Sequence, residues 1–78
     1  MENNTLSISS VAEMTGVSKN RIREWHEKGL LPGVQTIAVG TRHHRRFTED
    51  DIRIIRKIDE LQRKGFVLRV AAEKAVEE

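Results

Sequence analysis

Five consecutive side chains, from Arg42 to Arg46, are cationic or can become so, in the order Arg-His-His-Arg-Arg. Guanidinium groups are permanent cations whose hydrogen-bond geometry suits phosphate oxygens. No acidic residue occurs between Glu27 and Glu49, although the whole chain carries a net charge of only +2. Since like charges repel one another, such a run does not help a small protein to fold. We therefore infer a polyanionic partner, of which duplex DNA is the simplest.

A second group of side chains suited to nucleic acid lies upstream, at Lys19, Asn20 and Arg21. Asn and Arg have the bidentate geometry that fits the edges of adenine and guanine. Ser18 precedes them and is a typical helix N-cap, so all three should lie on the first turn of a helix, whose positive end favours phosphate. We assign Asn20 and Arg21 to base reading and Lys19 to a backbone contact. The alternative is that they are ordinary solvated helix residues.

One tryptophan and three histidines could also contact nucleic acid or a metal ion. Trp25 could stack on the DNA backbone, but in a chain with one Trp and two Phe we favour a core position. His26 could donate to a phosphate or simply fill space. His43 and His44 are adjacent, so a strand would direct them to opposite sides. Because no cysteine or carboxylate cluster accompanies them, we expect no metal site.

The composition restricts the class of protein. A chain of 78 residues forms one domain with a modest core, and 37% apolar with 4% aromatic residues leaves little room for a substrate pocket. The absence of cysteine excludes disulfides and fits a reducing cytosol. No apolar run approaches the ~20 residues of a membrane span, and no signal-peptide pattern is present. We expect a cytoplasmic binding protein and not an enzyme, with no cofactor, no membrane association and no small-molecule site.

Caps and turns predict the elements that carry these residues. Residues 1–7 are polar and are expected to be flexible, with the folded domain extending over 8–78. The segment Ser10-Val11-Ala12-Glu13 has the pattern of a capping box and predicts a short helix that stops before Gly16.

A second helix is predicted from about residue 19 to residue 28, with Ser18 as its N-cap and Gly29 as its stop. Two short helices joined by a tight turn have the spacing of a helix-turn-helix. Any helical hairpin in a small core would share that spacing.

The next segment, about residues 34–47, has the composition of a β-hairpin with Gly40-Thr41 as its turn. Strand alternation puts the cationic run on two faces, one with Arg42, His44 and Arg46 and the other with His43, Arg45 and Phe47. Phe47 should face the core and draw Arg45 partly inward. Arg42 and Arg46 are then the freer pair.

Thr48 followed by three acidic residues predicts the start of a long helix, and isoleucines at a spacing of three carry it towards Gly65. A last helix is expected over about residues 68–76. The predicted order is helix, turn, helix, hairpin, long helix and short helix. This is a mainly α fold with a small β-hairpin, of the winged helix-turn-helix type.

The residues themselves resemble the MerR family of DNA-binding regulators along nearly the whole chain. The matching motifs are Ile8-Ser9-Ser10-Val11-Ala12, Thr15-Gly16-Val17-Ser18, Ile22-Arg23, Gly29-Leu30-Leu31-Pro32, Arg45-Arg46-Phe47-Thr48-Glu49-Asp50-Asp51-Ile52 and Lys64-Gly65-Phe66-Val67-Leu68. Each motif alone is weak, but the set is specific.

The resemblance implies transcription regulation by binding promoter DNA as a dimer. The second helix, about residues 18–28, would enter the major groove, and the hairpin wing, about 34–47, would touch the backbone. It implies phosphate contacts from Arg23 and Arg45. Together with the residues chosen above, the expected DNA-binding set is Ser18, Lys19, Asn20, Arg21, Arg23, Trp25, His26, Arg42, His43, His44, Arg45 and Arg46.

The chain also departs from that family. Glu24 replaces an aromatic residue, the segment from Gly33 to His44 is longer than the usual wing, and the chain ends at Glu78, before the family's dimerisation helix and effector domain. We favour the DNA-binding domain of a bacterial MerR-like regulator. The alternative is a small excisionase-like, architectural or chromosome-anchoring protein of the nucleoid. A dimer is expected if the natural chain continues into a coiled coil, and otherwise a monomer or a DNA-assisted oligomer.

Overall fold

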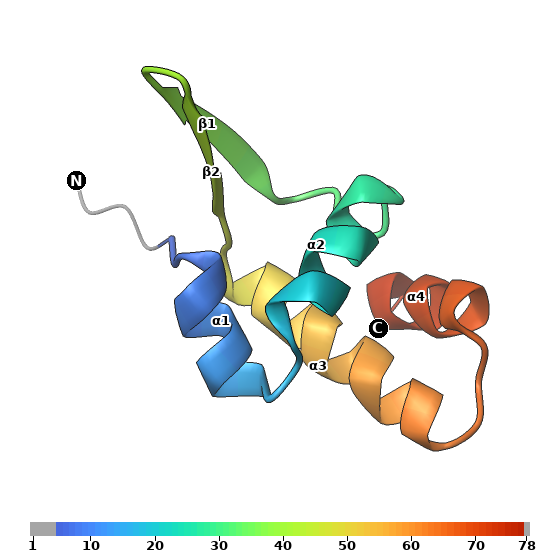
Figure 1. Ribbon diagram of the computed structural model, residues 1–78. Coiled ribbons are helices and arrows are strands. Elements are labelled where there is room, and N and C mark those ends of the chain that lie inside the picture. The colour runs from blue at the N-terminus through green and yellow to red at the C-terminus, as the bar shows by residue number, and fades with distance from the viewer. Residues whose placement is uncertain (1–4, 78) are drawn as a thin grey trace.

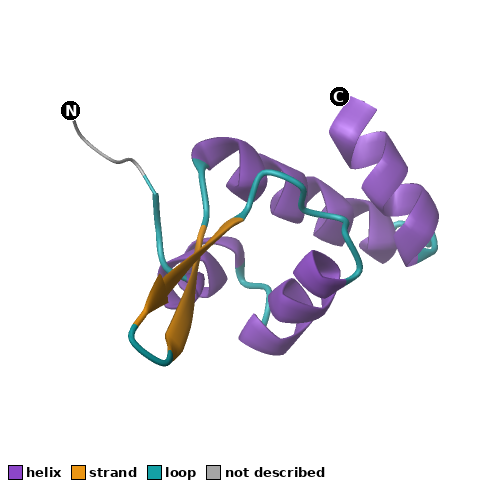
Figure 2. Cartoon of the chain, turned by 90° about the horizontal axis from the view of Figure 1, so that it is seen from above, coloured by secondary structure: helices purple, strands orange, loops and turns teal. Residues whose placement is uncertain are grey.

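The computed structural model describes residues 5–77, which fold into four helices and one antiparallel β-hairpin (Figure 1). The elements are α1 Ile8–Thr15, α2 Lys19–Glu27, β1 Gln35–Val39, β2 Arg42–Arg46, α3 Glu49–Arg63 and α4 Leu68–Glu77. The hairpin projects from one end of the helical body and α4 lies at the other end, in a molecule of 41 × 26 × 21 Å (Figures 1 and 2). This arrangement confirms the predicted fold class.

The first helix begins earlier than the sequence suggested. Its N-cap is Ser7, whose hydroxyl accepts a hydrogen bond from the Ser10 amide at 3.3 Å, so the predicted cap at Ser10 is wrong. The reason is a long-range contact. Leu6 and Phe47 exchange two backbone hydrogen bonds of 2.8 and 2.9 Å, and the chain turns into the helix directly after that bridge. Ordered contacts therefore start upstream of residue 8, while residues 1–4 of the predicted flexible segment lie outside the described residues.

The turn and caps around α2 follow the prediction. Gly16 has φ 77°, a left-handed conformation that favours glycine, and ends α1. Val17 is buried, and the Ser18 hydroxyl accepts from the Arg21 amide at 3.2 Å. Gly29, with φ 79°, follows the last turn of α2. The short connection between α1 and α2 is thus that of a helix-turn-helix.

The hairpin, which we call the wing, consists of β1, the turn Gly40-Thr41 and β2. Val39 pairs with Arg42 across this two-residue turn, and the register continues to Gln35 opposite Arg46. The turn and both strands agree with the sequence-based prediction. Every residue of β1 is exposed, so the wing stands away from the core except at its base.

The core lies among the four helices and the base of the wing. Thr48 and Asp51 form a capping box that starts α3, and Asp51 is buried beneath Gly33. Trp25 and Phe47 are the largest of the buried side chains, and they join α2 and the wing base to the aliphatic face of α3. The remaining buried apolar residues are Val11, Val17, Ile22, Leu31, Ile52, Ile55, Ile58, Leu61, Ala71, Ala72 and Ala75.

Candidate nucleic-acid interface

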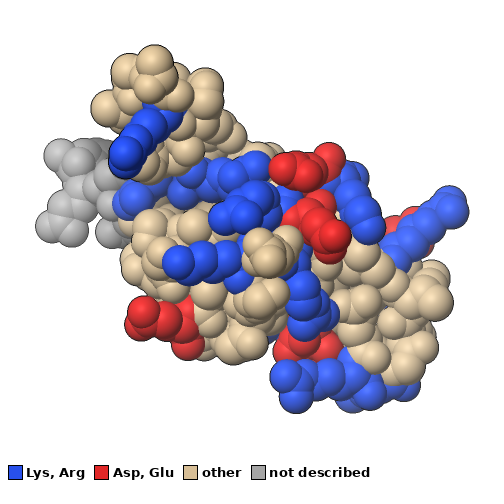
Figure 3. Space-filling model, in the orientation of Figure 1, with Lys and Arg blue, Asp and Glu red and all other residues tan. Residues whose placement is uncertain are grey.

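The helix α2 and the wing present their polar side chains on one common face. Figure 3 shows lysine and arginine side chains gathered across the middle of this face, with acidic groups directly beside them and at its lower rim. Arg45, in the cationic run of β2, contacts His26 and Glu27 in the last turn of α2, although the two elements are separate in sequence.

The first half of α2 is the part that is free of acids. Ser18, Lys19 and Asn20 are exposed, and Arg23 is partly buried. Arg23 Nη1 donates to Asn20 Oδ1 at 3.1 Å. Glu24 and Glu27 are exposed further along the helix. Because carboxylates repel phosphates, the N-terminal half of α2 is the half suited to a nucleic acid.

The Arg21 side chain is turned towards α3, whereas its predicted role in base reading would require it to face the DNA. Its guanidinium donates to Asp59 Oδ1 at 3.2 Å and to Gln62 Oε1 at 2.7 Å, both on α3. The same group lies 4.9 Å from the ring centroid of Trp25. Arg21 is thus held against α3, and its contacts tie the candidate recognition helix to the core.

Replacement of Arg21 by alanine should consequently affect stability more than sequence preference. The Arg21 side chain is 41% exposed, so its ion pair is largely screened and we expect a loss of about 1 kcal/mol, mostly from the Gln62 bond and the ring contact. Thermal unfolding followed by circular dichroism measures this. Arg63→Ala is the control, because Arg63 binds the same Asp59 from α3 and is 76% exposed. A relaxed base preference with unchanged stability would restore the original assignment.

Trp25 and His26 both make contacts within the protein. Trp25 is only 2% exposed, which agrees with the core position that the composition favoured and leaves little surface for DNA stacking. His26 accepts a hydrogen bond at Nδ1 from Arg45 Nε at 2.9 Å. This bond joins α2 to β2 across 19 residues of sequence, and no local pattern signals it.

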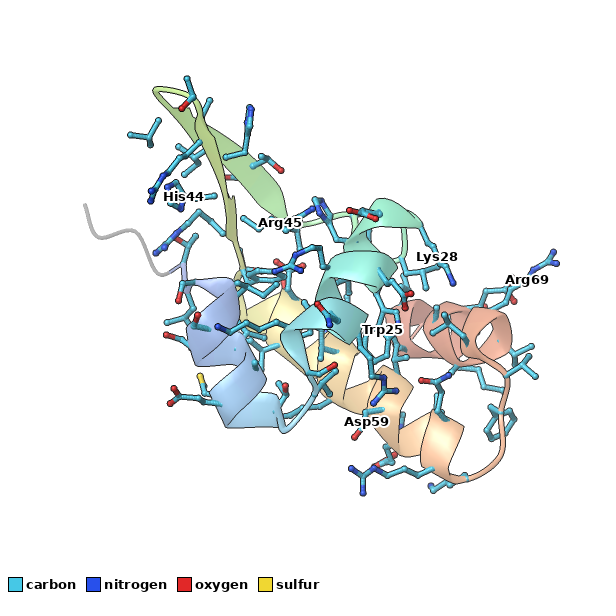
Figure 4. The ribbon with its side chains drawn as sticks, viewed as in Figure 1. Trp25, Lys28, His44, Arg45, Asp59 and Arg69 are labelled. Carbon is cyan, nitrogen blue, oxygen red and sulfur yellow. The ribbon has the colours of Figure 1, made fainter. Side chains whose placement is uncertain are left out.

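The wing arginines follow the prediction at Arg45 and depart from it at Arg46. Arg45 is 26% exposed and also lies 3.5 Å from Glu27, so it is drawn inward as expected (Figure 4). Arg46 is not free, because its Nε donates to the Thr5 hydroxyl at 3.1 Å and its Nη2 to the Thr5 carbonyl at 2.8 Å. The expectation of a free Arg46 failed because Thr5 was placed in a flexible segment. Arg42, His43 and His44 are exposed.

Neither a metal-binding cluster nor a membrane-spanning helix occurs in the described residues. Nowhere in residues 5–77 do three His, Cys, Asp or Glu side chains come together in a way that could hold a metal ion. Over the same range no helix has the length and apolar character needed to cross a membrane.

The comparisons with known proteins agree with this geometry. A family model described as MerR HTH family regulatory protein matches residues 6–76, which is nearly the whole chain. No curated protein matches the sequence significantly.

Proposed function

This chain belongs to the MerR family of helix-turn-helix regulatory proteins, and we propose that it binds duplex DNA sequence-specifically, with α2 in the major groove and the wing on the adjacent backbone. Membership of the family makes it a DNA-binding regulatory domain in general terms. Beyond family membership, we propose which groove α2 enters, which residues contact the DNA, and that binding depends on the base sequence.

The observation that carries the proposal is the tie between α2 and the wing. Arg45 binds His26 and Glu27, so the cationic strand is fixed beside the last turn of α2. A helix is about 10–12 Å wide with its side chains, which matches the roughly 12 Å width of the major groove. With α2 in the groove, the wing would reach the phosphates flanking it.

Base reading would then fall to the exposed start of α2. Asn20 has bidentate geometry for adenine, and its amide oxygen accepts a hydrogen bond from Arg23. Lys19 and Arg42 are exposed cations for the backbone. Since Arg21 is engaged by α3, we assign it no base contact in this proposal. Phosphate contacts would position the domain, and Asn20 would supply specificity.

Fluorescence anisotropy with short duplexes at several salt concentrations tests this proposal. The logarithm of affinity should fall with the logarithm of salt by about 0.9 per phosphate contact. Asn20→Ala should relax the preference at one base pair, whereas Arg42→Ala should weaken binding to all sequences equally. Salt-independent binding, or no binding to any duplex at low salt, would contradict the proposal.

One observation favours a second function, an architectural role of the excisionase-like or chromosome-anchoring kind. Ile37 and Val39 in the wing are 39% and 59% exposed, and apolar side chains are used by DNA-bending proteins to wedge between base steps. Circular-permutation gel shifts measure the bend. A footprint across many repeated sites would favour this role, and one isolated palindrome would favour a regulator.

We also propose where the domain acts and in which oligomeric state. We place it on the DNA of the nucleoid, as a dimer where a C-terminal coiled coil is present and otherwise as a monomer or a DNA-assisted oligomer. Sedimentation of the protein with and without duplex distinguishes these states.

A further inference from the structure

The outer edge of β1, which faces away from β2, has no strand beside it. The sheet has two strands, and within residues 5–77 only β2 pairs with β1. The five residues of β1, Gln-Thr-Ile-Ala-Val, are all exposed and uncharged. Proteins usually protect such an edge with lysine, proline or a bulge, because its free backbone groups attract another strand. β1 contains neither lysine nor proline, and its register with β2 is continuous.

The turn of the wing fixes which backbone groups lie on that outer edge. Val39 and Arg42 flank the two-residue turn and pair with each other, so the backbone groups of Val39 point towards β2. Residues of an antiparallel strand direct these groups alternately to the two edges. The N–H and C=O groups of Ile37 therefore also point towards β2, whereas those of Thr36 and Ala38 lie on the outer edge.

This arrangement is complementary to itself about a two-fold axis beside Ile37. Thr36 would lie opposite Ala38 of a second copy, and Ala38 opposite Thr36 of that copy. Both would be hydrogen-bonded pairs, in which the two residues exchange both of their bonds. The two Ile37 side chains would meet between them, in the non-hydrogen-bonded pair where side chains are closest. Val39 lies on the same face as Ile37 and would extend this apolar contact.

The distribution of charge favours a second copy as the occupant. β1 is uncharged, whereas β2 is Arg-His-His-Arg-Arg. Two paired β1 strands would keep the two cationic strands on the outside of a four-stranded sheet, about 14 Å apart, which is more than the Debye length of about 8 Å at physiological salt. A five-residue edge is too short to bury the roughly 1,200 Å² of a stable complex. The pair should therefore be weak in solution and form where DNA holds two copies close together.

We propose that the outer edge of β1 pairs with the same edge of a second copy of this chain, joining two wings into one antiparallel sheet. The inference rests on the proposed function, since bound duplex brings the two copies together. It gives the DNA-assisted oligomer a defined contact, and the two-fold axis places the two domains in opposite orientations on the DNA. Ile37 and Val39 then contact protein and not base steps.

A single introduced cysteine tests this register, because the chain has no cysteine of its own. At the axis the two Cα atoms of residue 37 would be about 4.5 Å apart, within the roughly 4.4–6.8 Å that a disulfide spans. Ile37→Cys should therefore give a disulfide-linked dimer on mild oxidation of concentrated protein without DNA. A non-reducing gel measures the rate at which this dimer forms.

Val39→Cys is the matched control for that rate. In the same register the two Cα atoms of residue 39 would be about 14 Å apart, too far for a disulfide. Val39 is nevertheless the more exposed, at 59% against 39% for Ile37, so random collisions would link Val39→Cys at least as fast. The pairing predicts that Ile37→Cys is linked at least about tenfold faster. Equal rates would overturn the pairing and leave the edge to a strand of another protein.

Ile37→Lys tests the pairing on DNA. The side chain is exposed, so the fold should be retained, and two lysines at the axis would repel each other. On a duplex long enough for two domains, the natural sequence should bind cooperatively in fluorescence anisotropy. Ile37→Lys should bind a duplex that holds one domain at least as tightly, because a cation is added, but lose the cooperativity. Thr41→Lys adds the same charge in the turn and should keep it.

The outcomes separate the pairing from the proposed function. Non-cooperative binding by the natural sequence, or unchanged cooperativity in Ile37→Lys, would overturn the pairing and leave the proposed function standing. Loss of DNA bending in Ile37→Lys without loss of cooperativity would assign Ile37 to a base step and overturn the pairing as well. Faster linking of Ile37→Cys in a protein that binds no duplex would support the pairing while contradicting the proposed function.

Discussion

Trp25→Ala is expected to remove a large part of the protein's stability. Trp25 is 2% exposed and joins α2 to the core, and truncation of a buried aromatic residue typically costs about 3–5 kcal/mol. A chain of 78 residues has a total stability of about 4–12 kcal/mol, so the loss is a large part of the whole. Urea unfolding followed by far-ultraviolet circular dichroism measures it without relying on the indole.

Trp25→Phe separates the core position from a DNA contact. Phenylalanine keeps most of the buried apolar contact, so the variant should remain folded with a smaller loss of stability. Because the indole has little exposed surface, the affinity of the Trp25→Phe variant for duplex DNA should stay within about threefold of the natural value. A variant that is stably folded but binds DNA far more weakly would show that Trp25 touches the nucleic acid.

Arg45→Ala is expected to lower the affinity for all duplexes by at least about tenfold. The residue offers a guanidinium to phosphate and also fixes the wing to α2 through His26 and Glu27. Removing it therefore takes away one contact and the positioning of the others. Anisotropy measurements at constant salt give the change.

Arg42→Ala is the control on the same strand. The Arg42 side chain is exposed and makes no hydrogen bond or ion pair with the described residues, so its loss should remove a single screened contact and cost only a few-fold in affinity. His26→Ala should weaken binding by an intermediate amount, and have little further effect once Arg45 is alanine. Additive losses at Arg45 and His26 would show that their hydrogen bond does not position the wing.

The sequence was sufficient for features that arise from neighbouring residues. The cap at Ser18, the turn at Gly40-Thr41 and the acidic start of α3 are local patterns, and the structure confirms them. The helical spacing of the isoleucines in α3 likewise predicted its buried face.

The failures concern partners that lie far apart in sequence. Arg21 finds Asp59 38 residues away, and Arg46 finds Thr5 41 residues away. No spacing rule links such pairs, because the link exists only after the helices and the wing have packed. The N-cap was misplaced for the same reason, since Ser7 and Ser10 are equally good caps and the bridge between Leu6 and Phe47 decides between them.

The central claim is that α2 and the wing bind duplex DNA as one surface. Titration of the isotope-labelled protein with a short duplex at low salt, followed by amide NMR, tests it most directly. Shifts should concentrate on the first half of α2 and on β2, with α4 unchanged. Shifts confined to α4 and the exposed side of α3, or no saturable shifts at all, would contradict the claim.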